Sequence, residues 1–438
     1  MGGVAAIARA AGHRVTGSDR NVYPPMSDQL AALGIELTEG FGSAQLDQGA
    51  DALLVGNVMT RGMPVVEEML DRRLPYVSGP EWLARHVLRD RRVIAVAGTH
   101  GKTTTTSLLA WILDCAGLEP GFLIGGVPRD FDSSARLGAG EWFVIEADEY
   151  DTAFFDKRAK FLHYRPEICT INNLEFDHAD IYADLEAIQW QFHQLLRAMP
   201  AAGRLILRAG DTNLDALLAR GCWTPVERFA SGAGDKPDWR CETAGNQLEL
   251  HRGDALIARV GWQLTGSHNA ENAAAAIAAA AAAGVAPEAA LEAVGRFSGV
   301  KRRLELRGSY SGVELYDDFA HHPTAIVRTI AGLRDTAEGR VLVVFEPRSN
   351  TMRMGVHRDT LAGAFDRADA VWVFAADDYD WDLPASFSSL SQAQVHRDTG
   401  SIVTAVAQTA RPGDRVVVMS NGGFEGIQER LAAALAAV

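Results

Sequence analysis

A pattern typical of a buried strand runs directly into a glycine-rich loop, and this junction constrains the fold of the chain more than any other feature. The apolar run at residues 93–97 precedes the loop GTHGKTT at residues 98–104, and a helical pattern continues to Cys115. In such a loop the glycines let backbone N–H groups turn toward an anion, Lys102 reaches terminal phosphates, and the Thr103 hydroxyl suits magnesium. We therefore expect a phosphate-binding loop in a parallel α/β sheet.

The loop departs from the strict form of this motif at one position. The strict form has a further glycine five residues before Gly101, where this chain has Val96. An ordinary glycine-rich turn is therefore the alternative interpretation. The strand pattern before the loop and the helical pattern after it favour phosphate binding.

Strand and helix patterns alternate along all 438 residues and divide into three segments. Residues 1–90 predict a parallel α/β domain, residues 91–298 contain the glycine-rich loop and end with an alanine-rich helix, and residues 299–438 predict a third open α/β sheet. Within the second segment, alternating hydrophobicity over residues 226–264 predicts an antiparallel extension of the sheet. The expected strands include the apolar runs at 143–145, 168–171, 205–207, 313–316, 341–345, 370–374 and 416–419.

Acidic side chains crowd the end of the apolar run at residues 143–145. Glu146, Asp148, Glu149 and Asp151 lie within six residues, and four such carboxylates repel one another unless water or a cation is present. His178 follows another strand of the same expected sheet. The pattern predicts a metal site that includes Glu146 and His178, with a solvated acidic turn as the alternative.

Further polar residues occur in each of the last two segments. Asn269 and Asn272 share a helix face, Arg303 ends a basic triplet, and Asp318 precedes the pair His321-His322. Each of these features alone is typical of a cap, a turn or a surface loop. Together they predict a cleft that closes on a nucleotide.

The charge balance excludes some partners. Lys and Arg total 42 against 56 for Asp and Glu, which gives a net charge of −14. This balance disfavours long-range attraction to nucleic acid or an anionic membrane. The four cysteines form no CxxC pair, and the amino end lacks the order of a secretory signal, so we expect a cytoplasmic protein without membrane insertion.

Seven segments in a fixed order resemble the ATP-dependent Mur ligases, and the resemblance extends over essentially the whole chain. They are GTHGKTTTT, EADEYD, NNLEFDHAD, GSHNAEN, KRRLELRG, YDDFAHHPTA and EPRSNTMRMG. The resemblance implies a three-domain α/β architecture with a Rossmann-like N-terminal domain, a P-loop central ATPase domain and a Rossmann-like C-terminal domain. It also implies ATP and Mg²⁺ as cofactors.

Within that family the chain resembles the ligases that join the tripeptide L-alanyl-γ-D-glutamyl-meso-diaminopimelate to UDP-N-acetylmuramate, a reaction of murein recycling. Tyr150 in EADEYD supports this choice, because the ligases that add L-alanine alone are expected to have serine there. Ligation of L-alanine to UDP-N-acetylmuramate is the alternative within the family. A non-catalytic ATP-sensing module is the alternative outside it, and a dinucleotide oxidoreductase is disfavoured because no GxGxxG follows a strand.

The resemblance also implies residue roles. Lys102 would contact the β and γ phosphates, Asn269 and Asn272 the adenine, and Asp318 the ribose. The implied catalytic residues are Lys102, Glu146, His178 and Arg303, and the implied metal ligands are Thr103, Glu146 and His178. The implied ATP-binding residues are Gly98, Thr99, His100, Gly101, Lys102, Thr103, Thr104, Asn269, Asn272, Arg303 and Asp318. The implied substrate contacts are Ser18, Asp19, Asn57, Arg348, Ser349, Asn350 and Asn421.

Two departures from the family pattern affect these expectations. Many relatives have a carbamylated lysine between the second metal ligand and the next strand, whereas residues 161–235 contain no lysine. Relatives also open with a strand and a glycine-rich turn, of which only Met1-Gly2-Gly3 remains here. We expect the cellular protein to start about fifteen residues upstream, by analogy with the family.

Overall fold

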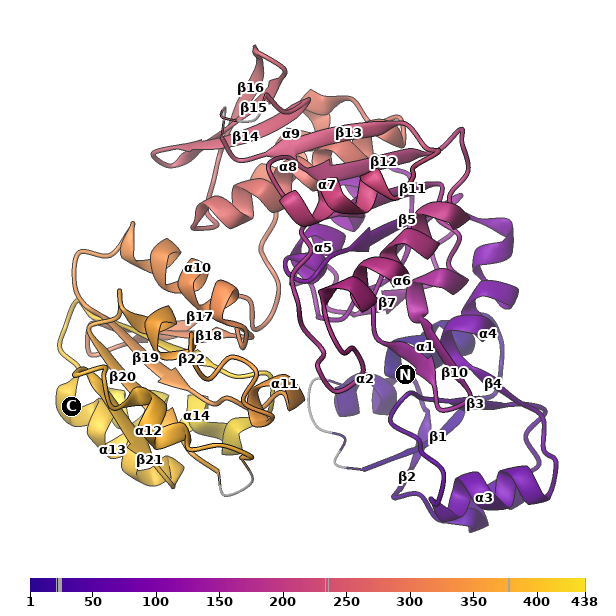
Figure 1. The fold of residues 1–438 in the computed structure, drawn as a ribbon, viewed down its shortest axis with the longest axis horizontal. Coiled ribbons are helices and arrows are strands. Elements are labelled where there is room, and N and C mark those ends of the chain that lie inside the picture. Colours follow the sequence, from indigo (N-terminus) through magenta and orange to yellow (C-terminus); the bar gives the residue numbers. More distant parts are fainter. Residues whose placement is uncertain (21, 23–25, 233, 235, 377–378, 438) are drawn as a thin grey trace.

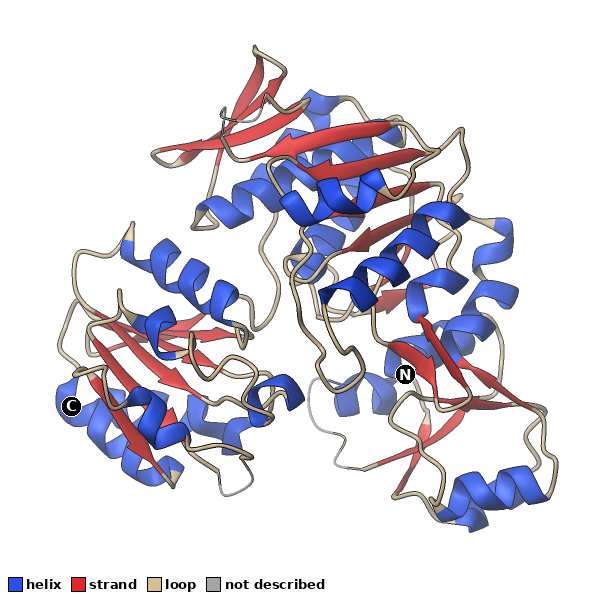
Figure 2. Cartoon of the chain, in the orientation of Figure 1, coloured by secondary structure: helices blue, strands red, loops and turns tan. Residues whose placement is uncertain are grey.

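The computed structural model describes residues 1–20, 22, 26–232, 234, 236–376 and 379–437. Figure 1 shows the N-terminal elements (indigo) at the lower right, the C-terminal elements (orange to yellow) at the lower left, and the central sheet above both. Helices cover both faces of the two large sheets (Figure 2). Sheets covered in this way bury both faces, which explains their nearly continuous apolar strands.

Among its described residues, the N-terminal region contains two separate parallel strand pairs rather than one sheet. Its strands pair as β1 (Thr16–Asp19) with β2 (Glu36–Glu39), and as β3 (Leu53–Val55) with β4 (Tyr76–Ser78). The parallel pairing confirms the α/β prediction for this region. The helical segments are α1 (Gly2–Ala10), α2 (Met26–Ala32), η1 (Ser43–Gln48), α3 (Pro64–Asp71), α4 (Gly79–His86) and η2 (Leu88–Asp90).

The central sheet has ten strands in the order β16-β15-β14-β13-β12-β11-β5-β8-β6-β7. The apolar run at 168–171 coincides with a strand, and the runs at 143–145 and 205–207 each lie within one. The strands are β5 (Arg92–Ala97), β6 (Gly121–Leu123), β7 (Ala135–Arg136), β8 (Trp142–Glu146), β11 (Ile168–Ile171), β12 (Arg204–Arg208), β13 (Val226–Ala230), β14 (Trp239–Ala244), β15 (Gln247–Arg252) and β16 (Ala255–Gly261). A small hairpin of β9 (Asp151–Ala153) and β10 (Asp156–Ala159) leads into η3 (Lys160–His163).

Two helical layers cover this sheet. One layer packs α5 (Lys102–Cys115), α8 (Ser267–Ala282) and α9 (Pro287–Gly295) into a single apolar cluster with the sheet. The other face is covered by α6 (Leu185–Ala198) and α7 (Thr212–Ala219), together with α1 and α4 from the N-terminal region. The alanines from 273 to 276 and from 278 to 280 are fully buried, because small side chains let α8 pack close to α5.

The predicted antiparallel extension is shorter than expected. β13 pairs in parallel with both β12 and β14, and antiparallel pairing begins only between β14 and β15. The prediction was therefore wrong for residues 226–230. Helix α7 is the reason, because it forms a crossover that returns the chain to the sheet in the same direction as β12.

In the described part of the C-terminal domain, the sheet has six strands in the order β17-β18-β22-β19-β20-β21, and of these only β17 is antiparallel to its neighbour. Apolar clusters on both faces confirm the predicted third α/β sheet. The strands are β17 (Glu305–Tyr310), β18 (Val313–Asp318), β19 (Val341–Phe345), β20 (Ala370–Phe374), β21 (Ala393–His396) and β22 (Arg415–Met419). The helices are α10 (Pro323–Arg334), α11 (Asn350–Arg353), η4 (Ala362–Phe365), α12 (Leu383–Phe387), α13 (Thr399–Thr409), η5 (Phe424–Gly426) and α14 (Ile427–Ala436).

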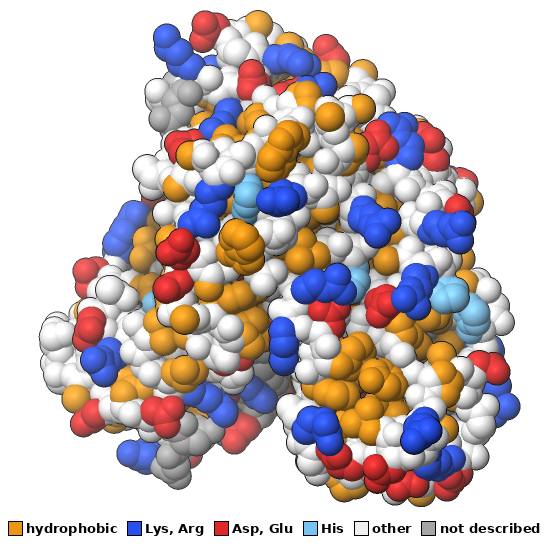
Figure 3. Space-filling view, turned by 45° about the vertical axis from the view of Figure 1, so that its right-hand side comes forward, with side chains coloured by type: hydrophobic (Ala, Val, Ile, Leu, Met, Phe, Trp, Pro, Cys, Tyr) orange, Lys and Arg blue, Asp and Glu red, His pale blue; other side chains and the backbone are white. Residues whose placement is uncertain are grey.

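The surface mixes charges of both signs. Figure 3 shows Lys and Arg side chains interspersed with Asp and Glu, and hydrophobic side chains gathered low on the right of the view. The exposed large hydrophobic residues of the N-terminal strands and of the hairpin include Leu37, Tyr76 and Phe155. Among the described residues, no helix is both long enough and apolar enough to cross a membrane.

Candidate active site

The glycine-rich loop joins the end of β5 to the start of α5, as the sequence predicted. Gly98 has φ +122° and Gly101 has φ +79°, backbone conformations that side-chain-bearing residues rarely adopt. A Cβ atom on Gly101 would lie 2.4 Å from Asn272 Oδ1 and 2.8 Å from Asn172 Nδ2. Glycine is therefore required at position 101 both by conformation and by space.

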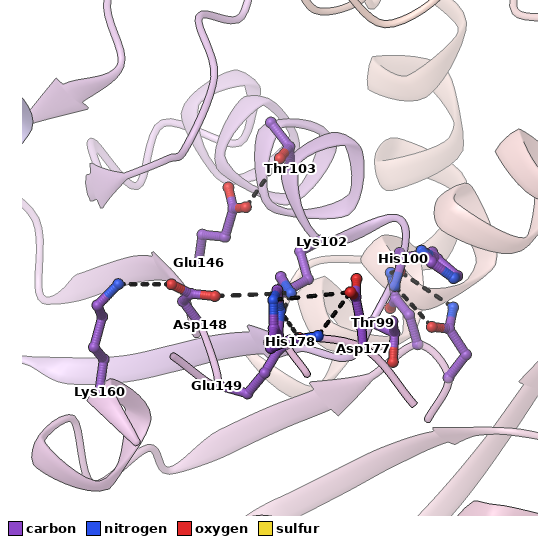
Figure 4. A network of polar contacts seen from close by, with 12 residues as sticks. Thr99, His100, Lys102, Thr103, Glu146, Asp148, Glu149, Lys160, Asp177 and His178 are labelled. Atoms are coloured by element: carbon purple, nitrogen blue, oxygen red, sulfur yellow. Dashed lines mark hydrogen bonds and ion pairs between the residues drawn. The ribbon is translucent and has the colours of Figure 1, made fainter. Parts of the chain in front are cut away.

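Lys102 points from the first turn of α5 into a group of carboxylates (Figure 4). Its Nζ donates a hydrogen bond of 2.7 Å to Glu149 Oε2 and lies 4.0 Å from Asp148 Oδ1. Burial opposes the charge on Lys102, but the carboxylates of Glu149 and Asp148 outweigh burial and raise the pKa of the lysine. The amine therefore remains a cation at the end of the central sheet.

A second group links the loop to the C-terminal domain. Thr103 Oγ1 donates a hydrogen bond of 2.9 Å to Glu146 Oε1, and Arg303 Nη2 donates one of 2.9 Å to the same Thr103 oxygen. Glu146 Oε2 also accepts the Gly125 N–H at 2.6 Å. A hydroxyl and a carboxylate side by side, with an arginine beside them, form an oxygen-rich and charged site of the type that phosphoryl transfer requires.

His178 lies in the loop after β11 and contacts Glu149, the carboxylate that also accepts a hydrogen bond from Lys102. Its Nε2 is 3.0 Å from Glu149 Oε1, and burial of the imidazole is outweighed by Glu149, so that the pKa of His178 is raised. Lys160 Nζ donates a hydrogen bond of 2.7 Å to Asp148 Oδ2 from the opposite side. Burial would raise the pKa of Asp148, but Lys160 and Lys102 lower it to about 2. The carboxylate is thus ionised.

These donors fit two magnesium ions. Thr103 and Glu146 offer hydroxyl and carboxylate oxygens, the ligands that magnesium prefers, and Asp148, Glu149 and His178 place ligand atoms within 4.8 Å of one another. Lys160 has a positive charge next to this second group, opposite in sign to a carbamylated lysine. Lys160 lies one residue before the lysine-free stretch and was not among the predicted site residues.

One cleft collects most of the predicted ATP-binding residues. Asn269 and Asn272 are both buried on one face of α8, as their spacing predicted, and Asn272 Nδ2 donates to Asn269 Oδ1 at 3.3 Å. The cleft lies between elements of the central domain and the start of the C-terminal domain. Of the predicted residues, those that line it are His100, Gly101, Thr103, Thr104, Asn269, Asn272, Arg303 and Asp318.

Asp318 is held by backbone N–H groups of two segments. Its Oδ2 accepts the Leu304 N–H at 2.6 Å and its Oδ1 accepts the Ala320 N–H at 2.8 Å. Burial raises the pKa of Asp318 although Arg303 and these hydrogen bonds oppose the shift. The same burial lowers the pKa of Arg303. The two residues are of opposite charge and both line the cleft.

Other residues at the loop were not predicted as contacts. Asn173 Oδ1 accepts the His100 N–H at 2.8 Å, and Asn172 Nδ2 donates to Thr105 Oγ1 at 2.9 Å. Both asparagines follow β11 directly, and β11 is hydrogen-bonded to β5. The sequence contains the signal, because polar residues after a buried strand are expected at the site edge of a parallel sheet.

The predicted sugar-nucleotide contacts lie in the N-terminal region. Ser18 and Asp19 end β1, and Asn57 follows β3, so that all three lie at the carboxyl ends of parallel strands. Asp19 is exposed, and its Oδ1 accepts the Arg20 N–H at 2.7 Å. None of the three lines the nucleotide cleft.

The predicted peptide contacts cluster at the carboxyl ends of β19 and β22. Ser349 caps α11 by accepting the Met352 N–H, and Asn350 Nδ2 donates a hydrogen bond of 2.9 Å to Asp180 Oδ2 of the central domain. Arg348 packs so closely on Gly422 that a Cβ there would lie 2.4 Å from the guanidinium. Asn421 Oδ1 is buried with no hydrogen-bond partner among the described residues.

Comparison with known proteins identifies the family. Three protein-family models match the chain. The Mur ligase middle domain matches residues 96–280, the Mur ligase glutamate ligase domain matches residues 302–422, and the Mur ligase family catalytic domain matches residues 1–91. An Escherichia coli (strain K12) protein is 50% identical over 442 residues, covering 100% of this chain and 96% of the relative. The chain belongs to the Mur ligase family.

The E. coli relative of this Mur ligase is named UDP-N-acetylmuramate--L-alanyl-gamma-D-glutamyl-meso-2,6-diaminoheptandioate ligase. A UDP-N-acetylmuramate--L-alanine ligase from Myxococcus xanthus is 32% identical, with 85% of this chain and 77% of the relative covered. The crystal structure of a murein peptide ligase from Psychrobacter arcticus is 45% identical, has a TM-score of 0.78 and covers 100% of this chain and 97% of that one. The UDP-N-acetylmuramate-alanine ligase of Thermotoga maritima has a TM-score of 0.80 at 22% identity over 99% of this chain and 96% of that chain, which shows the shared fold.

Proposed function

We propose that this Mur ligase uses ATP to join the tripeptide L-alanyl-γ-D-glutamyl-meso-diaminopimelate to UDP-N-acetylmuramate. The observation that carries the proposal is the contact of Arg303 from the C-terminal region with Thr103 of the glycine-rich loop, beside Glu146. The names of relatives that match nearly the full length support the choice of substrates. All four cysteines are unpaired, which supports a cytoplasmic location.

In this proposal the three domains have different functions. Residues 1–90 bind the UDP-sugar through Ser18, Asp19 and Asn57, and residues 91–298 bind ATP. Residues 299–438 close on the nucleotide and bind the peptide. The residues assigned to the peptide are Arg348, Ser349, Asn350 and Asn421.

The chemistry starts from a poor electrophile. A carboxylate resists attack by an amine because the attack adds charge to an anion, and phosphorylation by ATP converts it to an acyl phosphate with a good leaving group. Lys102 and Arg303 are placed to neutralise charge on the phosphoryl group as it moves. Magnesium, held by Thr103 and Glu146 and by Glu149 and His178, would supply further charge neutralisation.

The peptide amine then attacks the acyl phosphate. The attack forms the C–N bond, phosphate leaves, and the amine loses a proton. Lys102 and Arg303 can stabilise the oxyanion of the tetrahedral intermediate. Because the reaction needs three substrates in one place, alignment by the C-terminal domain lowers the entropic part of the barrier.

Isotope transfer tests the mechanism. UDP-N-acetylmuramate labelled with ¹⁸O in its carboxylate is incubated with the enzyme, ATP and tripeptide, and the released phosphate is analysed by mass spectrometry. We expect one labelled oxygen in the phosphate, because the acyl phosphate leaves with a carboxylate oxygen. Amide product with unlabelled phosphate would disprove the acyl-phosphate route.

A comparison of the two amine substrates tests which one the enzyme uses. Free L-alanine and the tripeptide are offered separately with ATP and UDP-N-acetylmuramate, and ADP release is measured. We expect rapid ADP release with the tripeptide and little with L-alanine. Turnover with L-alanine alone would assign the enzyme to the alanine ligases, and ATP binding without ADP release would indicate a nucleotide sensor.

A further inference from the structure

Two histidines and a glutamate converge beside the nucleotide cleft. His100 Nε2 lies 3.4 Å from Glu175 Oε2, and His322 Nδ1 lies 3.8 Å from the same oxygen. One ligand atom from each residue lies within 4.8 Å of the ligand atoms of the other two. The rings of His100 and His322 have centroids 4.6 Å apart. The three possible ligand atoms therefore lie close to one another.

The three side chains come from both sides of the domain boundary. His100 is in the glycine-rich loop and Glu175 follows β11, whereas His322 caps the start of α10 in the C-terminal region. The two central residues are fixed by the backbone, because Glu175 N–H donates to Thr99 Oγ1 at 2.8 Å and the His100 N–H donates to Asn173 Oδ1. The group can thus form only when the C-terminal domain lies against the loop.

The pKa shifts of two of the three side chains agree with metal binding. Burial lowers the pKa of His322, which keeps its imidazole neutral. Burial would raise the pKa of Glu175, but hydrogen bonds and charge from His100, together with the Thr324 hydroxyl, lower it and keep the carboxylate ionised. A metal ion binds neutral imidazole and ionised carboxylate.

His322 also has an unsatisfied nitrogen. Its side chain is 8% exposed, and its Nε2 is buried without a hydrogen-bond partner among the described residues. Its Nδ1 accepts only a long hydrogen bond, 3.3 Å, from the Thr324 N–H. An ion can bind the single lone pair of Nδ1 only in place of this long hydrogen bond, and Nε2 then carries the ring proton.

We propose that His100, Glu175 and His322 bind one transition-metal ion, such as Zn²⁺, that clasps the C-terminal domain to the glycine-rich loop. Two imidazoles and one carboxylate are a zinc-type ligand set and differ from the oxygen-rich sets that magnesium prefers. Thr324 Oγ1 donates to Glu175 Oε2 at 2.7 Å and orients that ligand. An ion at this position stabilises the closed arrangement, because its ligands come from both domains.

The site is separate from the proposed magnesium sites. Those sites use Thr103 with Glu146, and Glu149 with His178. Of the three proposed zinc ligands, His100 lines the nucleotide cleft, whereas Glu175 and His322 do not. Figure 4 shows His100 to one side of the carboxylates around Lys102. Magnesium in excess should therefore fill the oxygen-rich sites and leave the histidine site free for a softer ion.

Cobalt absorption tests the proposal without relying on activity. Co²⁺ is titrated into the full chain with excess magnesium, and the visible spectrum distinguishes four-coordinate from six-coordinate cobalt. We expect one equivalent to bind with the intense four-coordinate spectrum and to be displaced by Zn²⁺. In His322→Gln and in Glu175→Gln the affinity should fall by more than about tenfold.

The control is His251→Gln, because His251 belongs to a third candidate cluster with Glu242 and Glu249 in the antiparallel extension. This variant should bind cobalt as the wild type does. X-ray absorption of the zinc-loaded wild type should show two imidazoles, a readout that does not depend on any variant folding. The proposal would be overturned if cobalt gave only a six-coordinate spectrum, or if the His322 and Glu175 variants bound cobalt as tightly as the wild type. A zinc coordination shell without two imidazoles would also overturn it.

Discussion

Arg303 Nη2 lies 2.9 Å from Thr103 Oγ1, although 200 residues separate the two in the sequence. Thr103 is in the first turn of α5, and Arg303 precedes the first strand of the C-terminal sheet. The contact joins the domain that holds the glycine-rich loop to the domain that would close over it. The guanidinium can therefore lie against the glycine-rich loop only while the two domains are in contact.

Replacing Arg303 by alanine should lower kcat strongly. The guanidinium is placed to neutralise charge that develops in the transition state, and removal of one such group costs about 10²- to 10³-fold in kcat. ADP release with saturating substrates measures the effect. Arg307→Ala is the matched control, since Arg307 pairs with exposed Glu429 and should leave kcat unchanged. Equal rates in the two variants would remove Arg303 from the catalytic group.

Lys102→Ala and Glu146→Ala should each abolish ligation and leave the fold intact. Lys102 contacts Glu149, and Glu146 contacts Thr103, so both lie at the loop rather than in the apolar core. Initial rates measure ligation, and circular dichroism checks folding. Lys157→Ala is the control, because Lys157 pairs with Asp151 and is largely exposed. Turnover within a few fold of wild type in either site variant would contradict these assignments.

Asn350→Asp should weaken the approach of the C-terminal domain. Asn350 Nδ2 donates to Asp180, which also accepts the Tyr150 hydroxyl at 2.9 Å. A carboxylate at position 350 would face Asp180 directly, and because Asp180 is exposed, repulsion between the two charges costs about 1 kcal/mol. We expect the KM for tripeptide to rise by about tenfold. Asn350→Ser, which removes the hydrogen bond without adding charge, should have a smaller effect, and the reverse order would argue against repulsion.

Asp414 should make the C-terminal domain sensitive to acid. Burial would raise the pKa of Asp414, but Arg340 Nη2 at 2.6 Å and the Arg411 N–H at 2.8 Å outweigh it and lower the pKa. Because the folded-state pKa lies below the unfolded value, the stabilisation is complete above the unfolded pKa of about 3.9 and is lost as the pH falls through the folded value.

Asp414→Asn removes this contribution. At neutral pH the variant should unfold with a free energy lower by about 1 to 2 kcal/mol, a value reduced by the partial exposure of Arg340. The difference from wild type should shrink below about pH 4, as calorimetry over a pH series would show. Glu338→Gln, at an exposed carboxylate, is the control. A difference that stays constant with pH would refute the role of the charge.

Local patterns in the sequence predicted the strands and the loop well. The run at 341–345 forms β19, and the glycine-rich loop follows β5 as expected. Such features depend on residues close in sequence: an apolar run must be buried, and only glycine fits the backbone at position 101. The i, i+3 spacing of Asn269 and Asn272 likewise placed both on one helix face.

Contacts between distant segments were decided by the tertiary structure. Sheet order puts β11 and β8 on either side of β5, which brings His178 and Glu149 to within 3.0 Å of each other beside the loop. Domain closure brings His322 to Glu175 and Asn350 to Asp180. The sequence by itself determined which short segments become strands, helices and loops, because local packing and backbone sterics govern those choices. Only the tertiary structure decided which side chains share a site, since strand order and domain contact depend on burying surfaces far apart along the chain.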